Sequence, residues 1–193
     1  MLARVTTFQG RLERADEGAR IFQDGMPAIR GLTGFEDAVL LLDRDSGKVM
    51  TIALWEDEEA LNSSTAAVAD LFKQAADTVA SEPERRIYEV VEHRPGDNRR
   101  YARVSTGSVK PEWFEQEGDG SIIEAASRQP GYAGFLVLAD RKHNQIIGMS
   151  FWDSQENLDA SESGYYTDEM EKSREQFEGG QWERNVYEVA AQS

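Results

Sequence analysis

An internal repeat constrains the fold of this chain more than any other feature. Three blocks recur in the same order: Ala3–Thr7 as Ala102–Thr106, Gly34–Trp55 as Gly131–Trp152, and Tyr88–Val90 as Tyr187–Val189. Long-period self-similarity of this kind indicates repeated copies of one supersecondary unit. We therefore predict an N-terminal copy over residues 1–93 and a C-terminal copy over residues 101–193. The residues between them, 94–100, are polar, basic and turn-rich, which is typical of an exposed linker.

Each copy is predicted to run strand, helix, strand, strand, helix, strand. Strands are favoured by alternating β-branched and apolar residues, and helices by apolar residues at three- and four-residue spacing. In the first copy we expect these elements over residues 2–8, 13–29, 35–43, 49–55, 57–79 and 87–91. Two βαβ crossovers in this order give an α+β ferredoxin-like unit, a four-stranded antiparallel sheet with both helices on one face.

The ferredoxin-like plan leaves the second face of each sheet bare. A second copy of the same sheet is the simplest cover, and the tether raises its effective concentration. We therefore predict an intramolecular pseudo-dimer. Further homo-oligomerisation is possible and is not assigned.

Charge and composition narrow the partners. The chain has 36 acidic and 21 basic side chains and a net charge of −15, which repels phosphate backbones and anionic lipids. We expect neither a nucleic acid nor a membrane as a partner, and the longest apolar runs are far shorter than the roughly 20 residues of a membrane span. The chain has no cysteine and no signal-peptide pattern at its N-terminus, so we expect a cytoplasmic protein.

A shared motif joins the third strand to the second helix in both copies. The strand ends in Trp, and acidic or polar residues then open the helix: Leu54–Leu61 in the first copy and Phe151–Leu158 in the second. Gly34-Phe35 and Gly131-Tyr132 open the second strands. In these features each copy resembles the antibiotic-biosynthesis-monooxygenase-like domains of the dimeric α/β-barrel superfamily. The resemblance covers nearly the whole chain twice and implies a barrel-type pseudo-dimer.

The resemblance does not by itself select an activity. Members of that group include cofactor-free oxygenases of aromatic polyketides, haem-degrading proteins and proteins with no known activity, so the fold supports several functions. In the oxygenases, activation of the substrate as an electron-rich anion lets it reduce oxygen directly. Such chemistry needs a pocket with an anion stabiliser and little else.

Trp55 and Trp152 are the first candidates for a pocket. Each shares a strand face with small residues, Ala53 and Thr51 or Ser150 and Gly148. The resemblance implies that this Trp borders the cavity between sheet and helices, where small neighbours leave room for a planar ligand. The alternative is that the small residues admit a closely packed helix.

Arg4 and Arg103 are expected in the central first strand, where an unpaired charge is costly. Glu89 and Glu188, on the adjacent last strand, would supply structural partners across the ladder. The sharper alternative is that the arginines bind a substrate anion.

The repeated Tyr88 and Tyr187 would donate a hydrogen bond into a cavity or simply pack. The second copy adds Trp113 and Phe114 at the expected start of its first helix and Tyr165-Tyr166 in its second. If one pocket is active, this asymmetry favours the C-terminal one. The alternative is that Trp113 and Phe114 cap the core at a helix start.

Two histidines, His93 and His143, limit metal and acid–base chemistry. His143 falls in a hairpin turn and His93 at the end of a strand, so neither matches the helix-borne iron ligand of the haem degraders. No spacing typical of a metal site is present. We predict a protein without metal or cofactor.

These observations predict a cofactor-independent monooxygenase acting on an aromatic, phenolic or polyketide-like small molecule. The candidate pocket residues are Trp55, Trp152, Arg4, Arg103, Trp113, Tyr165, Tyr88 and Tyr187. The alternative is a non-catalytic protein of the same fold that binds a hydrophobic metabolite or has a structural or stress-related role.

Overall fold

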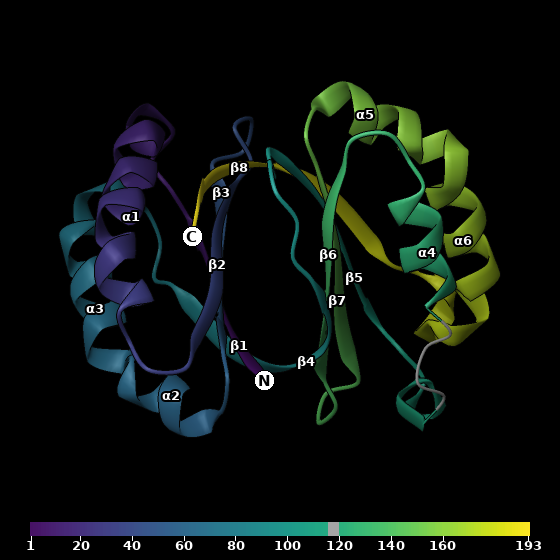
Figure 1. The fold of residues 1–193 in the computed structure, drawn as a ribbon, viewed down its shortest axis with the longest axis horizontal. Coiled ribbons are helices and arrows are strands. Elements are labelled where there is room, and N and C mark those ends of the chain that lie inside the picture. Colours follow the sequence, from purple (N-terminus) through teal and green to yellow (C-terminus); the bar gives the residue numbers. More distant parts are fainter. Residues whose placement is uncertain (116–119) are drawn as a thin grey trace. The chain divides into compact units, whose positions relative to one another are not determined.

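The computed structural model describes residues 1–115 and 120–193 and divides into two compact units (Figure 1). The first unit comprises Met1–Glu89 together with Tyr187–Ser193, and the second comprises Val90–Val186. The last strand of the chain is therefore divided: its beginning belongs to the second unit and its end to the first. The repeat boundaries at 93 and 101 remain predictions.

The first unit has helices over one face of an antiparallel sheet (Figure 1). Its strands are β1 (Leu2–Gln9), β2 (Phe35–Leu42), β3 (Lys48–Trp55), the first part of β4 (Glu84–Arg94) and the last part of β8 (Glu183–Gln192). Its helices are α1 (Ala15–Arg30), α2 (Glu58–Ser63) and α3 (Thr65–Gln74), with 3₁₀ turns at Leu12–Arg14 and Ala76–Thr78.

Strand β1 is an interior strand of this sheet, between β3 and β4, as the sequence predicts. Arg4 on β1 faces Ala53 on β3 on one side and Ile87 on β4 on the other. Strand β3 pairs with β2 on its other side, and β2 pairs with residues 188–192 of β8. The first unit thus completes its sheet with the end of the chain.

The second unit repeats this arrangement with different helices. Its strands are the rest of β4, β5 (Tyr101–Ser108), β6 (Tyr132–Asp140), β7 (Gln145–Trp152) and the start of β8. Its helices are α4 (Ser121–Ser127), α5 (Gln155–Ser161) and α6 (Thr167–Ser173), with a π-helical turn at Glu162–Tyr166 and 3₁₀ turns at Pro111–Glu115, Arg174–Gln176 and Glu178–Gly180. Strand β7 lies between β5 and β6.

Local chemistry explains where the hairpins turn and the helices begin. The Asp43 carboxylate accepts hydrogen bonds from the backbone N–H groups of Asp45 and Ser46, and Gly47 adopts a φ of +75° that an L side chain disfavours. Asp57 caps α2 by accepting from the Ala60 N–H at 2.9 Å. Ser154 caps α5 in the same way. The shared motif at the end of β3 and β7 is thus a helix N-cap.

The α+β fold of two ferredoxin-like repeats is confirmed. The structure differs from the expected helices in detail. The single helix expected over residues 57–79 is two helices, α2 and α3, followed by a 3₁₀ turn. Val79 is extended and bridges Gly10. Trp113 and Phe114 lie in a 3₁₀ turn, not in a long first helix, and residues 116–119 of that expected helix lie outside the described residues.

The stretch expected as an exposed linker is only partly exposed. Arg99 is buried, and its guanidinium lies 5.5 Å from the centre of the Phe151 ring. Gly96 packs against the backbone of Ala133, where an added Cβ would lie 2.4 Å from the Ala133 oxygen. The connection is therefore built into the second unit, although its composition is that of a loop.

Candidate functional site

Arg103 is the centre of the candidate site in the second unit. Its side chain rises from β5 toward the helical layer and is 1% exposed. One terminal nitrogen donates to the Leu158 carbonyl and the Ser161 hydroxyl, both at 2.8 Å, and lies 3.1 Å from the Glu162 carboxylate. The guanidinium is therefore held by the end of α5 and the start of the π-helical turn.

Aromatic rings surround the rest of this guanidinium. Its carbon lies 4.3 Å from the Tyr166 ring centre, 5.8 Å from that of Trp152 and 6.0 Å from that of Tyr165. Cation–π attraction strengthens when the cation is desolvated. The π-helical turn brings the neighbouring residues Tyr165 and Tyr166 to the same cation, and π-turns are frequent at functional sites.

A cavity of about 110 Å³ lies beside Arg103, between the sheet and the helices. Its wall is mainly aromatic and aliphatic, with a few polar groups. The lining residues are Arg103, Ser105, Trp113, Ile122, Phe135, Val137, Ile146, Gly148, Ser150, Tyr165, Tyr166, Met170, Ser173, Gln176 and Phe177. An apolar cavity with a small number of convergent polar groups is typical of a small-molecule site.

One polar atom of Arg103 is left unsatisfied. The buried Nε has no hydrogen-bond partner in the part of the chain that the structure describes. A buried N–H without a partner costs on the order of 1–3 kcal/mol. The unsatisfied donor therefore belongs to an arginine that also lines the cavity.

The hydroxyl groups around the cavity keep their protons. Burial is the main cause that raises the pKa of Tyr165 and of Tyr166 above its ordinary value. The Tyr166 hydroxyl lies 2.7 Å from the Ser105 hydroxyl, and Trp152 Nε1 donates to Ser150 at 3.0 Å. The site therefore offers hydrogen-bond donors and a cation.

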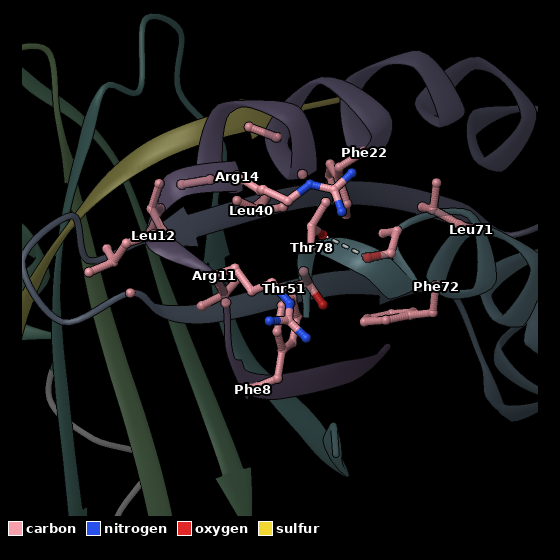
Figure 2. A pocket seen from close by; sticks show the side chains of 18 residues that line it. Phe8, Arg11, Leu12, Arg14, Phe22, Leu40, Thr51, Leu71, Phe72 and Thr78 are labelled. Atoms are coloured by element: carbon pink, nitrogen blue, oxygen red, sulfur yellow. Dashed lines mark hydrogen bonds between the residues drawn. The ribbon is translucent and has the colours of Figure 1, made fainter. Parts of the chain in front are cut away.

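The first unit carries a different cavity, of about 40 Å³ (Figure 2). Apolar side chains from β1, α1 and α3 form most of its wall, among them Phe8, Phe22, Leu71 and Phe72. Arg4 does not line it. The Arg4 guanidinium instead donates to the Leu61 carbonyl at 2.7 Å and to the hydroxyls of Ser64 and Thr65.

The expected ladder pairs of the two arginines are wrong. The register places Ile87, not Glu89, opposite Arg4, and Glu188 binds Arg44 through two hydrogen bonds of 2.6 and 2.9 Å. Both arginines point into the helical layer, where a carbonyl and a hydroxyl at the end of α2 or of α5 accept hydrogen bonds from them. Pairing across strands was expected because the sequence does not show on which face the partners lie.

The other predicted site residues divide into two groups. Trp113 and Tyr165 line the cavity with Arg103, and Trp152 lies behind them, fully buried and 6.1 Å from Tyr165. Trp55 is equally buried, but it does not line the first-unit cavity. The structure thus places three second-copy candidates, Trp113, Trp152 and Tyr165, at or beside the cavity that Arg103 lines.

The two repeated tyrosines lie elsewhere. Tyr88 on β4 and Tyr187 on β8 are buried, and neither lines either of the cavities described above. Sequence reasoning missed Ser161, Glu162 and Phe135. The repeated Ser64 and Ser161 could have identified the first of these, since a serine at the same place in both copies indicates a shared anchor.

Metal and histidine chemistry find no support in the described ranges. No group of three or more His, Cys, Asp or Glu side chains there could hold a metal ion. His143 is exposed in the β6–β7 turn, with its Nδ1 at 2.6 Å from the Asp140 carboxylate. Nor is any helix in those ranges long and apolar enough to cross a membrane.

Known proteins resemble this chain both in sequence and in fold. An uncharacterized protein of Mycobacterium tuberculosis is 24% identical over 185 residues, which cover 90% of this chain and 75% of the relative. Among solved structures, a candidate monooxygenase from Fusobacterium nucleatum has a TM-score of 0.80 at 15% identity and covers 100% of this chain and 93% of its own.

Two further structures have the same fold. A candidate monooxygenase from Lactobacillus acidophilus has a TM-score of 0.75 at 12% identity, with 100% and 95% of the two chains covered. An anthrone oxidase-like protein has a TM-score of 0.62 at 15% identity, with 100% and 92% covered. At these identities the likeness concerns the fold.

The family model that matches is that of the antibiotic biosynthesis monooxygenases, over residues 1–66. This match lies in the first repeat, and the solved structures extend the likeness in fold to the whole chain. The resemblance read from the sequence is therefore confirmed: residues 1–66 match the antibiotic biosynthesis monooxygenase family, and the whole chain shares the ferredoxin-like fold of the solved structures in two repeats.

Proposed function

We propose that the second unit binds a planar aromatic molecule as its anion beside Arg103 and oxygenates it without a cofactor. The observation that carries this proposal is the buried, unpaired Nε of an arginine that lines an aromatic cavity. Preorganised donors in a water-poor site stabilise developing negative charge without reorganisation. A phenolate or enolate oxygen is the ligand group that such a donor suits.

The charges around the cavity favour an anion. Arg103 and Arg184 both pair with the single carboxylate of Glu162, which leaves this cluster with one net positive charge. The tyrosine hydroxyls nearby stay neutral because burial raises their pKa. By contrast, a hollow of about 440 Å³ beside α2 is lined by Glu56, Asp57 and Glu59 and would repel an anion.

The size of the cavity limits what it encloses. An apolar cavity of roughly 150 Å³ is known to hold one benzene ring. The cavity beside Arg103, at about 110 Å³, therefore encloses one ring after small side-chain adjustments, and the other rings of a polycyclic substrate would lie outside it. The enclosed ring would lie among Trp113, Tyr165 and Tyr166.

The proposed reaction needs only the substrate and molecular oxygen. A substrate CH₂ group next to a phenolic ring loses a proton to water, which later returns one to the peroxide, and the resulting anion transfers one electron to O₂. The two radicals combine to form a C–O bond and a hydroperoxide, which loses water to leave a carbonyl. One oxygen atom enters the product and the other leaves as water, and the CH₂ group supplies all four electrons.

Oxygen consumption with dithranol, an anthrone with phenolic groups, tests the proposal. We expect uptake above the spontaneous rate, and we expect Arg103→Lys to lower it about a hundredfold, the effect of losing one positioned donor. Arg4→Lys is the matched control in the first repeat and should leave the rate unchanged. Uptake that is equal in both variants would overturn the role of Arg103.

The second candidate function is binding without catalysis. The same cavity and the same unpaired Nε support it, because neither requires a reaction. Binding of dithranol to the wild-type protein without oxygen uptake above the spontaneous rate would favour this function. In either case the proposed partner is a hydrophobic or aromatic small molecule, and the proposed location is cytoplasmic.

A further inference from the structure

One difference between the two repeats on the strand that forms the cavity floor is the presence or absence of a side chain. Thr51 on β3 pairs with Thr6 and Leu40, and Gly148 on β7 pairs with Ser105 and Val137. These partners correspond to each other in the two copies, so Thr51 and Gly148 occupy the same place in their sheets. The first copy has a β-branched side chain there and the second has none.

Gly148 opens directly onto free space. A Cβ built at this position would meet no heavy atom within 4 Å. Other strand glycines of the second unit differ, since a Cβ on Gly107 would lie 2.7 Å from the Phe177 ring and one on Gly134 would lie 2.8 Å from the Arg94 oxygen. Close packing therefore requires Gly107 and Gly134, but not Gly148. The space above Gly148 belongs to the cavity that Arg103 lines.

The first repeat separates its cavity from its arginine. Thr51 points into the first-unit cavity (Figure 2), while Arg4 lies outside its lining. The anchors of the two arginines are otherwise matched, since Leu61 and Ser64 in one copy correspond to Leu158 and Ser161 in the other. The open space on the cavity side of Arg103 is therefore one feature that distinguishes the second repeat.

We infer that Gly148 is the specificity-determining residue that makes the second repeat the ligand-binding one, for a single-ring phenolate or the phenolic edge of a larger aromatic. The ring rests on the bare backbone at Gly148, and its oxygen lies toward the Arg103 guanidinium. A threonine there would occupy the volume that the ring needs. This inference rests on the proposed function, since it concerns the ligand of the same site.

Transfer of the first repeat's residue into the second gives the sharpest test. Gly148→Thr places a residue with high strand propensity where its counterpart already exists, so the sheet should tolerate it. The probe is para-nitrophenol, whose phenolate has its own visible absorbance. We expect its dissociation constant to rise at least about tenfold, because a hydrophobic pocket discriminates about 10- to 200-fold per methylene.

A smaller substitution guards against misfolding. Gly148→Ala adds only a Cβ in free space and should fold like the wild type, with a smaller loss of affinity than Gly148→Thr. Thr51→Ala is the matched control in the first repeat and should leave para-nitrophenol binding unchanged. Thermal unfolding of each variant shows that the fold is intact.

The outcomes separate this inference from the proposed function. Wild-type affinity in folded Gly148→Thr would overturn the role of Gly148 and leave the site beside Arg103 standing. Equal losses in Gly148→Ala and Thr51→Ala would also overturn it, because position 51 would then matter as much. A wild-type protein that bound no phenolate would instead overturn the proposed function. Binding without oxygen uptake would overturn only the catalytic step.

Discussion

Arg4 and Arg103 stand at the same place in two copies of one unit, and their surroundings differ on one side only. Toward the end of α2 or of α5, each donates to a leucine carbonyl and a serine hydroxyl. On the other side, Arg103 has Glu162, Tyr165 and Tyr166, where the first copy has Thr65, Val68 and Ala69 in the aligned positions. The comparison shows that the duplication preserved the anchor of the arginine, while the residues facing the cavity diverged.

Removal of each guanidinium should give the largest difference between the two repeats in the free energy of unfolding. Arg103→Met loses a carboxylate, a carbonyl, a hydroxyl and three aromatic contacts, and should lower the free energy of unfolding by about 3 kcal/mol. Arg4→Met loses only neutral acceptors and should cost about 1–2 kcal/mol. Urea denaturation followed by circular dichroism measures both. Equal costs would show that the aromatic side contributes nothing.

The two buried tryptophans offer the next test. Trp152 Nε1 donates to Ser150 Oγ, so Ser150→Ala leaves a buried donor without a partner. We expect a loss of about 1–3 kcal/mol in the free energy of unfolding. The wavelength of the tryptophan emission maximum should change in the same variant, because the indole of Trp152 loses its polar neighbour. An unchanged unfolding midpoint would mean that the indole finds another acceptor.

The reciprocal change in the first repeat should stabilise the protein. Ala53 takes the place of Ser150, and the buried Nε1 of Trp55 has no hydrogen-bond partner within the described residues. Ala53→Ser supplies an acceptor in the matched geometry and should raise the free energy of unfolding by about 0.5–1.5 kcal/mol. Ala53→Val, which adds bulk without an acceptor, is the control. A stabilisation by valine as large as that by serine would attribute the effect to packing.

The smallest effect is expected for the ion pair of Arg44 and Glu188 in the first unit. The double hydrogen bond from Arg44 is the main cause that lowers the pKa of Glu188. A depressed carboxyl pKa gives stability that is present above the unfolded value, about 4.3, and is lost as the pH falls through the folded value.

Because both side chains are partly exposed, Glu188→Gln should cost less than about 1 kcal/mol at neutral pH. The difference from the wild type should vanish in acid, and urea denaturation at neutral pH and at pH below about 4 checks it. A cost that stays constant with pH would show that the charge of Glu188 is not its cause.

Much of the fold could be predicted from the repeat and from the spacing of apolar side chains. The hydrogen bonds of helices and strands are regular, so each element has a period that the sequence shows. The Trp-ended strand and the capping Asp57 and Ser154 are visible in the sequence for this reason. The candidate site was predicted in part: Arg103, Trp113 and Tyr165 share one cavity.

The missed features depend on where side chains point. The pairing of Arg103 with Leu158 and Ser161 was missed because a strand pattern gives two possible faces and does not say which carries the partner. The π-helical turn was missed because adjacent tyrosines would diverge on a regular α-helix. The burial of Arg99 was missed because the composition of residues 94–100 is that of a loop.

The divided strand β8 has a consequence for how the protein is made. The first unit includes residues 187–193, and strand β2 pairs with residues 188–192. A ribosome releases these residues only after Val90–Val186, so the N-terminal unit waits for them before its sheet is complete, while most of the second unit is already available. Long-range pairings of this kind slow folding and leave a strand edge open in the meantime. A nascent chain stalled before residue 187 would therefore hold an unfinished first unit, and the earliest-made half of the protein would be the later one to mature.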